Sequence, residues 1–197
     1  DVANTYSGTT TITGGTITID GAGVLASGDY NANIINNAAL DYSSSATQSF
    51  DGVISGTGAL TVSSGALTVT GDNTYSGATT VAGGTLTIST NNALGTIAAG
   101  TTVANGAVLD LANIAYFTAE ALALSGTLSA STGTSSFAGV TTLVADSIFD
   151  VDGTSLTMSE QIVGANNITK TGTGNLILKD VANTYSGTTT ITGGTIT

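Results

Sequence analysis

Short segments in which apolar residues occupy every second position recur along the whole chain. Thr or Ser stands between the apolar positions, and this alternation is typical of half-buried β-strands. Such segments lie at residues 15–19, 59–62, 66–69, 84–88, 107–111, 121–124, 175–178 and 194–197. Residues 114–124 are the one place where a short helix competes, and their Ala-Leu-Ala-Leu end again alternates. The pattern predicts an all-β fold.

The alternation also predicts which side chains form the core. We expect inward positions at Ile17, Ile19, Leu60, Val62, Leu67, Val69, Leu86, Ile88, Leu109, Leu111, Leu176 and Leu178. Gly and Asn pairs separate the segments, and these residues tolerate the positive φ values of tight corners. The sequence therefore predicts many short strands that are joined by tight turns.

Residues 1–18 and 180–197 are the same string, DVANTYSGTTTITGGTIT. The sequence thus returns to its starting point at Asp180, and repetition at a fixed period is typical of stacked solenoids rather than sandwiches. We expect residues 1–197 to form a single continuous β-solenoid segment. In it, residues 1–179 are one tandem period and residues 180–197 begin the next copy.

A third copy of the motif lies inside the period. Residues 73–88 read NTYSGATTVAGGTLTI, against NTYSGTTTITGGTITI at residues 4–19. The copies start at Asn4, Asn73 and Asn183, so the second offset is longer than the first. Coils of about 22–23 residues would divide these offsets into three and five coils, and the period into about eight.

The positions shared by the three copies are predicted to be structural. They are Asn4, Tyr6, Gly8, Gly14, Gly15, Asn73, Tyr75, Gly77, Gly83, Gly84, Asn183, Tyr185, Gly187, Gly193 and Gly194. The tyrosines could stack on sugars, but their recurrence beside turn residues favours rings that plug the corners. The asparagines are expected to bond the backbone of their own corner.

Composition narrows the classes of function. The chain has no Cys, His, Arg or Pro, and only two basic residues, Lys170 and Lys179, against thirteen acidic ones, a net charge of −11. Disulfides and Cys/His zinc sites are therefore impossible, and nucleic acid and anionic membranes are disfavoured as partners. No apolar run approaches the roughly 18 residues of a membrane helix, so no direct membrane insertion is expected in this segment.

The acidic residues offer the little chemistry there is. Most are spread along the chain, whereas Asp146, Asp150 and Asp152 are close together. A hydrolase with paired acids, a Ca²⁺ site and a solvated acidic face are three interpretations of this group. Ca²⁺ is the only cofactor considered, and the known calcium-binding sequence patterns are absent. No catalytic or cofactor-binding residue is predicted.

Residues 168–197 read ITKTGTGNLILKDVANTYSGTTTITGGTIT, and this stretch resembles the autotransporter-associated β-strand repeat of bacterial surface proteins. A second match covers residues 54–88 but lacks the lysine that Lys170 supplies in the first. The resemblance implies a right-handed parallel β-helix in the passenger of a secreted, extracellular adhesin or similar cell-surface protein.

Together these observations predict a structural, non-enzymatic function. We expect a segment of an extracellular filament that serves as a cell-surface scaffold or stalk, with other copies of itself as partners, end to end and in lateral bundles. The alternative is an adhesin passenger that binds surface glycans or host matrix. A β-helical polysaccharide-degrading enzyme is the third possibility.

Overall fold

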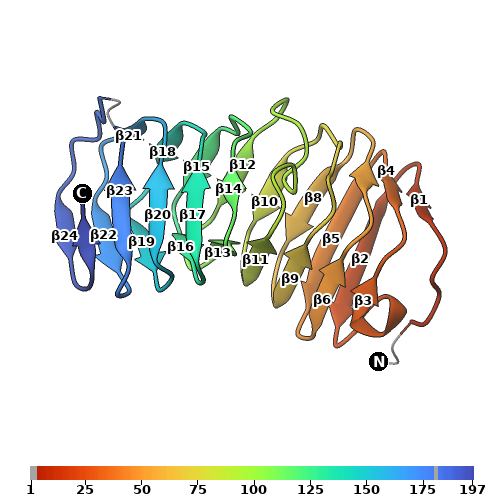
Figure 1. Cartoon of the computed structure of the whole chain (residues 1–197). Coiled ribbons are helices and arrows are strands. Elements are labelled where there is room, and N and C mark those ends of the chain that lie inside the picture. The colour runs from red at the N-terminus through yellow and green to blue at the C-terminus, as the bar shows by residue number, and fades with distance from the viewer. Residues whose placement is uncertain (1–3, 180–181) are drawn as a thin grey trace.

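The protein was analysed as a computed structural model, which describes residues 4–179 and 182–197. Its 25 short strands wind into a parallel β-solenoid (Figure 1). One 3₁₀ turn, Ala26–Gly28, interrupts the first coil, and no α-helix occurs in the part of the chain that the structure describes. The predicted all-β solenoid class is confirmed.

The strands form four sheets, and each strand pairs in parallel with the strands of neighbouring coils. The three-stranded sheet contains β1 (Thr10–Ile12), β4 (Ile34–Asn36) and β7 (Ile54–Ser55). The eight-stranded sheet contains β2 (Thr16–Gly21), β5 (Ala39–Ser44), β8 (Ala59–Val62), β10 (Thr79–Val81), β12 (Thr101–Val103), β15 (Leu122–Leu124), β18 (Thr141–Leu143) and β21 (Ile162–Gly164).

The largest sheet has nine strands and so records about nine turns of the solenoid. It contains β3 (Asp29–Tyr30), β6 (Thr47–Phe50), β9 (Ala66–Val69), β11 (Thr85–Ile88), β13 (Val108–Leu111), β16 (Thr127–Ala130), β19 (Ser147–Val151), β22 (Ile168–Thr171) and β24 (Thr189–Ile191). The five-stranded sheet contains β14 (Ala115–Tyr116), β17 (Thr134–Phe137), β20 (Ser155–Met158), β23 (Asn175–Leu178) and β25 (Thr195–Ile196). The stack of coils bends near its middle, around β11 and β13 (Figure 1).

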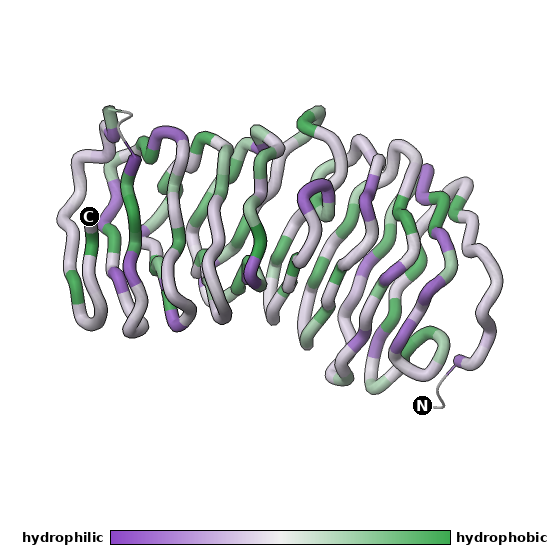
Figure 2. Tube along the Cα trace, in the orientation of Figure 1, coloured by the Kyte–Doolittle hydropathy of each residue, from purple (hydrophilic) through white to green (hydrophobic). Residues whose placement is uncertain are grey.

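The core is a column of side chains that point inward from every coil. Ten of the twelve predicted inward residues are buried, while Ile17 and Leu178 are half-buried and pack against the core. Aromatic rings stack along the column. Tyr30 lies edge-on to Phe50 with ring centroids 6.3 Å apart, and Tyr116 is stacked on Phe137 at 5.6 Å. The apolar interior therefore runs along the solenoid axis, and hydrophobic segments (green in Figure 2) recur along the whole stack of coils.

The three motif copies do not stack on one another. Within one coil the chain passes through β4, β5 and β6, which belong to the three-, eight- and nine-stranded sheets in that order. The equivalent motif strands β1, β10 and β24 lie in the three-, eight- and nine-stranded sheets respectively. Each copy is thus placed one face further round the solenoid than the copy before it.

The prediction that the offsets between motif copies are whole numbers of coils is therefore wrong. The physical reason is that most coils are shorter than the assumed length of about 22–23 residues, as the register pairs Leu60–Thr79 and Thr127–Ile148 show, although single coils differ in length. Leu60 pairs with Thr79 across a short coil, whereas Thr10 pairs with Ile34 across a longer one. The full period contains about eight coils and two-thirds of another, in line with the predicted number of coils.

The second glycine of each Gly-Gly pair is required by the corner it makes. Gly15, Gly84 and Gly194 have φ values of 73°, 68° and 65°, where a side chain is strained. A Cβ on Gly84 would also lie 2.2 Å from the carbonyl oxygen of Gly65 in the preceding coil. These positions let one coil lie directly on the next.

Candidate interaction surface

Six aspartates accept a hydrogen bond from a side chain in the following coil. The pairs, with oxygen–donor distances of 2.5–2.9 Å, are Asp41–Ser63, Asp51–Thr70, Asp72–Asn92, Asp110–Ser131, Asp146–Asn167 and Asp150–Thr171. Hydrogen bonds to an ionised carboxylate are stronger than neutral ones. These carboxylates join successive coils and do not converge on one another.

Two of the three aspartates considered for calcium, Asp146 and Asp150, also bond the following coil. Asp146 accepts from the backbone N–H and the side chain of Asn167, and these bonds lower the pKa of its carboxyl. Asp150 bonds Thr171, and Asp152 is exposed in the next turn. Among residues 4–179 and 182–197, no three His, Cys, Asp or Glu side chains are grouped so that they could hold a metal ion. The calcium hypothesis gains no geometric support.

Two of the three motif asparagines, Asn73 and Asn183, bridge coils, which sequence reasoning missed. Asn73 is buried, accepts a hydrogen bond from the backbone N–H of Ile54 at 2.7 Å, and donates to the carbonyl of Ala93 at 2.7 Å. Asn183 accepts from the N–H of Ile162 at 2.8 Å. Only Asn4 makes the predicted bond within its own corner, to the N–H of Tyr6 at 3.2 Å. The prediction is wrong for Asn73 and Asn183, because each accepts instead from a backbone N–H of the adjacent coil.

Each of the three motif tyrosines makes the same kind of hydrogen bond. Tyr6, Tyr75 and Tyr185 each bond the threonine four residues later, Thr10, Thr79 and Thr189, at 2.9, 2.5 and 2.8 Å. Tyr75, between two coils, is fully buried, and burial raises the pKa of its hydroxyl. A ring enclosed in this way cannot stack on a sugar. Tyr75 is a corner plug.

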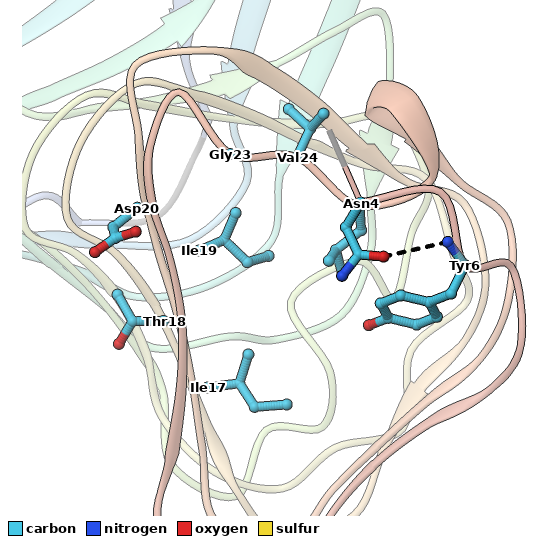
Figure 3. Close-up of a pocket in the computed structure, with 9 residues that line it drawn as sticks. Asn4, Tyr6, Ile17, Thr18, Ile19, Asp20, Gly23 and Val24 are labelled. Atoms are coloured by element: carbon cyan, nitrogen blue, oxygen red, sulfur yellow. Dashed lines mark hydrogen bonds between the residues drawn. The ribbon is translucent and has the colours of Figure 1, made fainter. Parts of the chain in front are cut away.

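A groove of about 350 Å³ occurs at the first described coil (Figure 3). Ile17 and Ile19 point into it from β2, while Asn4 and Tyr6 face them from the opposite segment. In the copy at residues 73–88, the residues equivalent to Tyr6 and Ile19 are Tyr75 and Ile88, and both are covered by adjacent coils. The groove is therefore the inner surface of a coil, of the same kind as the core elsewhere.

Lys170 is buried, which is unusual for a charged side chain. Its Nζ donates to the carbonyl oxygens of Thr171, Gly172 (3.0 Å) and Gly193 (3.3 Å), and so links its own corner to the next coil. Desolvation lowers the pKa of the ammonium, an effect that Asp150 and Asp152 oppose. The lysine of the Lys-Thr-Gly-x-Gly motif thus has a structural role, and the motif alone did not show it.

A second buried charged residue, Glu120, lies just before β15. It is 1% exposed, and one carboxyl oxygen accepts a hydrogen bond from Thr101 at 2.9 Å. Within the described part of the chain the other oxygen has no hydrogen-bond partner, and the same holds for the buried hydroxyls of Tyr116 and Thr141. Desolvation raises the pKa of Glu120. With one carboxylate and no basic partner among the described residues around it, this cluster lacks the paired groups of an acid–base site.

The two most exposed apolar side chains among the described residues, Phe117 and Ile97, lie at one corner of the solenoid, while Val144 and Ile191, 58% and 51% exposed, lie outside it. We define the apolar corner as residues 95–100, 117–121 and 138–140, the segments that lead into β12, β15 and β18. It contains Ile97, Phe117 and Val140, which are 63%, 72% and 42% exposed. In Figure 2 a hydrophobic stretch marks the loop that projects beside β10 and β12. Because the three segments belong to neighbouring coils, these exposed apolar side chains make the corner a candidate interaction site.

An open groove of about 170 Å³ adjoins this corner. Small residues line it, among them Ala99, Gly100, Ala121 and Ala123, together with Thr102 and Thr142. The adjoining Phe117 backbone is held in place, because its N–H donates to Asn91 Oδ1 at 2.5 Å and Thr118 Oγ1 donates to Asn92 Oδ1 at 2.7 Å. The corner therefore combines a fixed exposed aromatic residue with an adjacent groove.

Parts of the chain are similar to a repeat known from other proteins. The family model for the passenger-associated-transport-repeat matches residues 2–19, 55–88 and 168–197. The predicted resemblance is confirmed. These matches contain the three motif copies, with the bridging asparagines, the tyrosine plugs and Lys170.

A relative of known name aligns along almost the whole chain. The chain is 34% identical over 191 residues to a protein named adhesin BmaC autotransporter, from Brucella suis biovar 1 (strain 1330). The alignment takes in 96% of this chain but only 5% of that relative, so the chain is comparable with a small part of it. No solved structure matches. No helix within the described ranges is long and apolar enough to cross a membrane.

Proposed function

We propose that this chain is part of the passenger of a secreted, surface-exposed, adhesin-like protein, and that it serves there as a structural stalk. The observation that carries the proposal is the repetition of one coil-joining motif along a parallel solenoid. Asn73 bonds both the preceding and the following coil, and the motif matches a repeat of passenger proteins. A structure that contacts only its neighbours can be lengthened without a change of design.

The non-enzymatic interpretation rests on how the ionisable groups are used. Six carboxylates are bonded to the next coil, and Lys170 and Glu120 are inside the solenoid. A polysaccharide hydrolase needs two carboxyl groups about 5–10 Å apart that face a substrate groove. The two grooves described above are lined by apolar and small residues, with Asp20 as their one ionised carboxylate.

Electron microscopy of chains with increasing copy number tests the stalk. With about 4.8 Å between coils, each added copy of the period should lengthen a rod by about 40 Å at constant width. Chains of two, four and six copies give the slope directly. Particles whose length does not grow in proportion to copy number would refute the proposal.

An adhesive function is the second candidate, and the apolar corner together with the name of the relative favours it. Beads coated with the chain and with a Phe117→Ser variant would be compared for adhesion to glycan- and matrix-coated surfaces. A pure stalk predicts no adhesion above uncoated beads. Adhesion that depends on Phe117 would move the function from stalk to adhesin.

A further inference from the structure

We propose that the apolar corner is a self-docking surface, at which two copies of this chain associate side by side. In this arrangement Phe117 of each copy enters the groove of the other, the groove lined by Ala99, Ala121 and Ala123. The inference concerns lateral contact and does not depend on the stalk.

Size and position make the corner complementary to itself. The groove of about 170 Å³ is comparable to cavities of about 150 Å³ that accept a benzene ring. Phe117 lies only four residues before Ala121 of the groove wall. A projecting residue and a matching groove on one patch are what a twofold contact requires, because each partner supplies both halves.

Charge also favours a second copy at this place. The chain has a net charge of −11, so two copies repel one another over most of their surfaces. The three segments of the apolar corner contain a single ionisable residue, Glu120, and its side chain is buried. Like charges are few at the corner and lie at its margin, where the exposed Asp72 bonds Asn92 and the exposed Glu160 lies in the next coil. A basic partner would instead be drawn to the acidic faces.

The backbone of the corner is already fixed, which reduces the cost of docking. Phe117 and Thr118 are tied to the loop of the preceding coil through both Asn91 and Asn92. An aromatic anchor on a preorganised backbone loses little conformational entropy when it binds. Both copies have this fixed backbone, so the loss of conformational entropy is small on both sides of the contact.

Sedimentation equilibrium of the chain between about 10 μM and 1 mM tests self-docking. The contact is small, so we expect a weak dimer that becomes more populated as salt rises, since salt screens the repulsion. Phe117→Ser should weaken dimerisation by about tenfold or more, because the contact loses two anchors. Ala123→Gln, which fills the groove and keeps Phe117, should weaken it as well.

Ile148→Ser is the matched control, since Ile148 is 39% exposed on the outer face of β19 and lies outside the corner. It should leave dimerisation unchanged, and circular dichroism should show all variants folded. The chain has no cysteine, so a mixture of Phe117→Cys and Ala123→Cys chains should form a mixed disulfide faster than a mixture of Phe117→Cys and Thr157→Cys chains.

A chain that stays monomeric at 1 mM would overturn the proposal. So would a dimer that is indifferent to Phe117 and Ala123, or equal cross-linking of the two cysteine mixtures. If the dye bis-ANS bound the monomer in a Phe117-dependent way and no dimer formed, the corner would be assigned to another apolar ligand and self-docking rejected.

Discussion

Replacing Asn73 by alanine tests how the coils are held together. The side chain bonds the N–H of Ile54 and the carbonyl of Ala93, each at 2.7 Å, and the residue is 2% exposed. Alanine would leave one buried donor and one buried acceptor without partners. At about 1–3 kcal/mol for each unpaired group, we expect Asn73→Ala to lower the free energy of unfolding by about 2–6 kcal/mol.

The other two motif copies supply matched controls. The Asn183 side chain makes one bond to a neighbouring coil, whereas the Asn4 side chain bonds the N–H of Tyr6 in its own corner. The loss of stability should therefore fall in the order Asn73, Asn183, Asn4, with Asn4→Ala within about 0.5 kcal/mol of wild type. Urea denaturation followed by circular dichroism gives the three values. In addition, hydrogen exchange should show faster exchange at the Ile54 amide in Asn73→Ala. Equal values for the three alanine variants would refute the coil-bridging role.

Three further changes probe the other buried polar groups. Because burial raises the folded-state pKa of Glu120, the stabilisation conferred by its protonated form is complete below the unfolded-state pKa and is lost as pH rises through the folded-state pKa. The stability of Glu120→Gln relative to wild type should therefore increase from pH 4 to pH 8 in urea titrations, and a constant difference would contradict the assignment. Lys170→Met should cost about 1–3 kcal/mol, since the carbonyls of Gly172 and Gly193 lose their donor, whereas Lys179→Met on the exposed surface should change little. Tyr75→Phe leaves the buried Thr79 hydroxyl unpaired and should cost about 1 kcal/mol or more in thermal unfolding, clearly more than Tyr185→Phe at the half-buried copy.

Local alternation was enough to predict the strands and the core. Leu60, Val62, Leu67 and Val69 are buried as expected, because period-two patterning is fixed by the pleat of the strand. The corner glycines could also be anticipated, since positive φ selects glycine. These features depend on residues near one another in sequence.

What could not be predicted depends on which segments become neighbours. The coil length is set by which segments stack, as in the Leu60–Thr79 and Thr127–Ile148 pairs, so the assumed length of about 22–23 residues per coil placed the motif copies on the wrong faces. Asn73 finds equivalent partners in its own corner and in adjacent coils, and only the stacking decides between them. Nothing in the sequence pattern indicated that Lys170 and Glu120 are buried, because the hydrogen bonds that hold them, to carbonyls and to Thr101, come from segments brought together by the stacking.

The exposure of Phe117 at the apolar corner also depends on a neighbouring coil, so the sequence pattern did not predict it. Residues 114–124 looked like a strand with a helical alternative, and nothing in that pattern distinguishes the buried Tyr116 from its exposed neighbour Phe117. The difference arises because Asn91 of the preceding coil bonds the Phe117 and Thr118 amides and turns the chain outward.

The account stands on a parallel solenoid whose motif copies advance one face at a time. Pyrene labels on paired cysteines measure this directly, because excimer emission needs adjacent side chains. Thr169 and Thr190 are register partners in the nine-stranded sheet, so labels at these two positions should give excimer emission. Labels at Ile177 and Thr190, which lie in different sheets, should give none. Excimer emission from 177/190 and its absence from 169/190 would contradict the account.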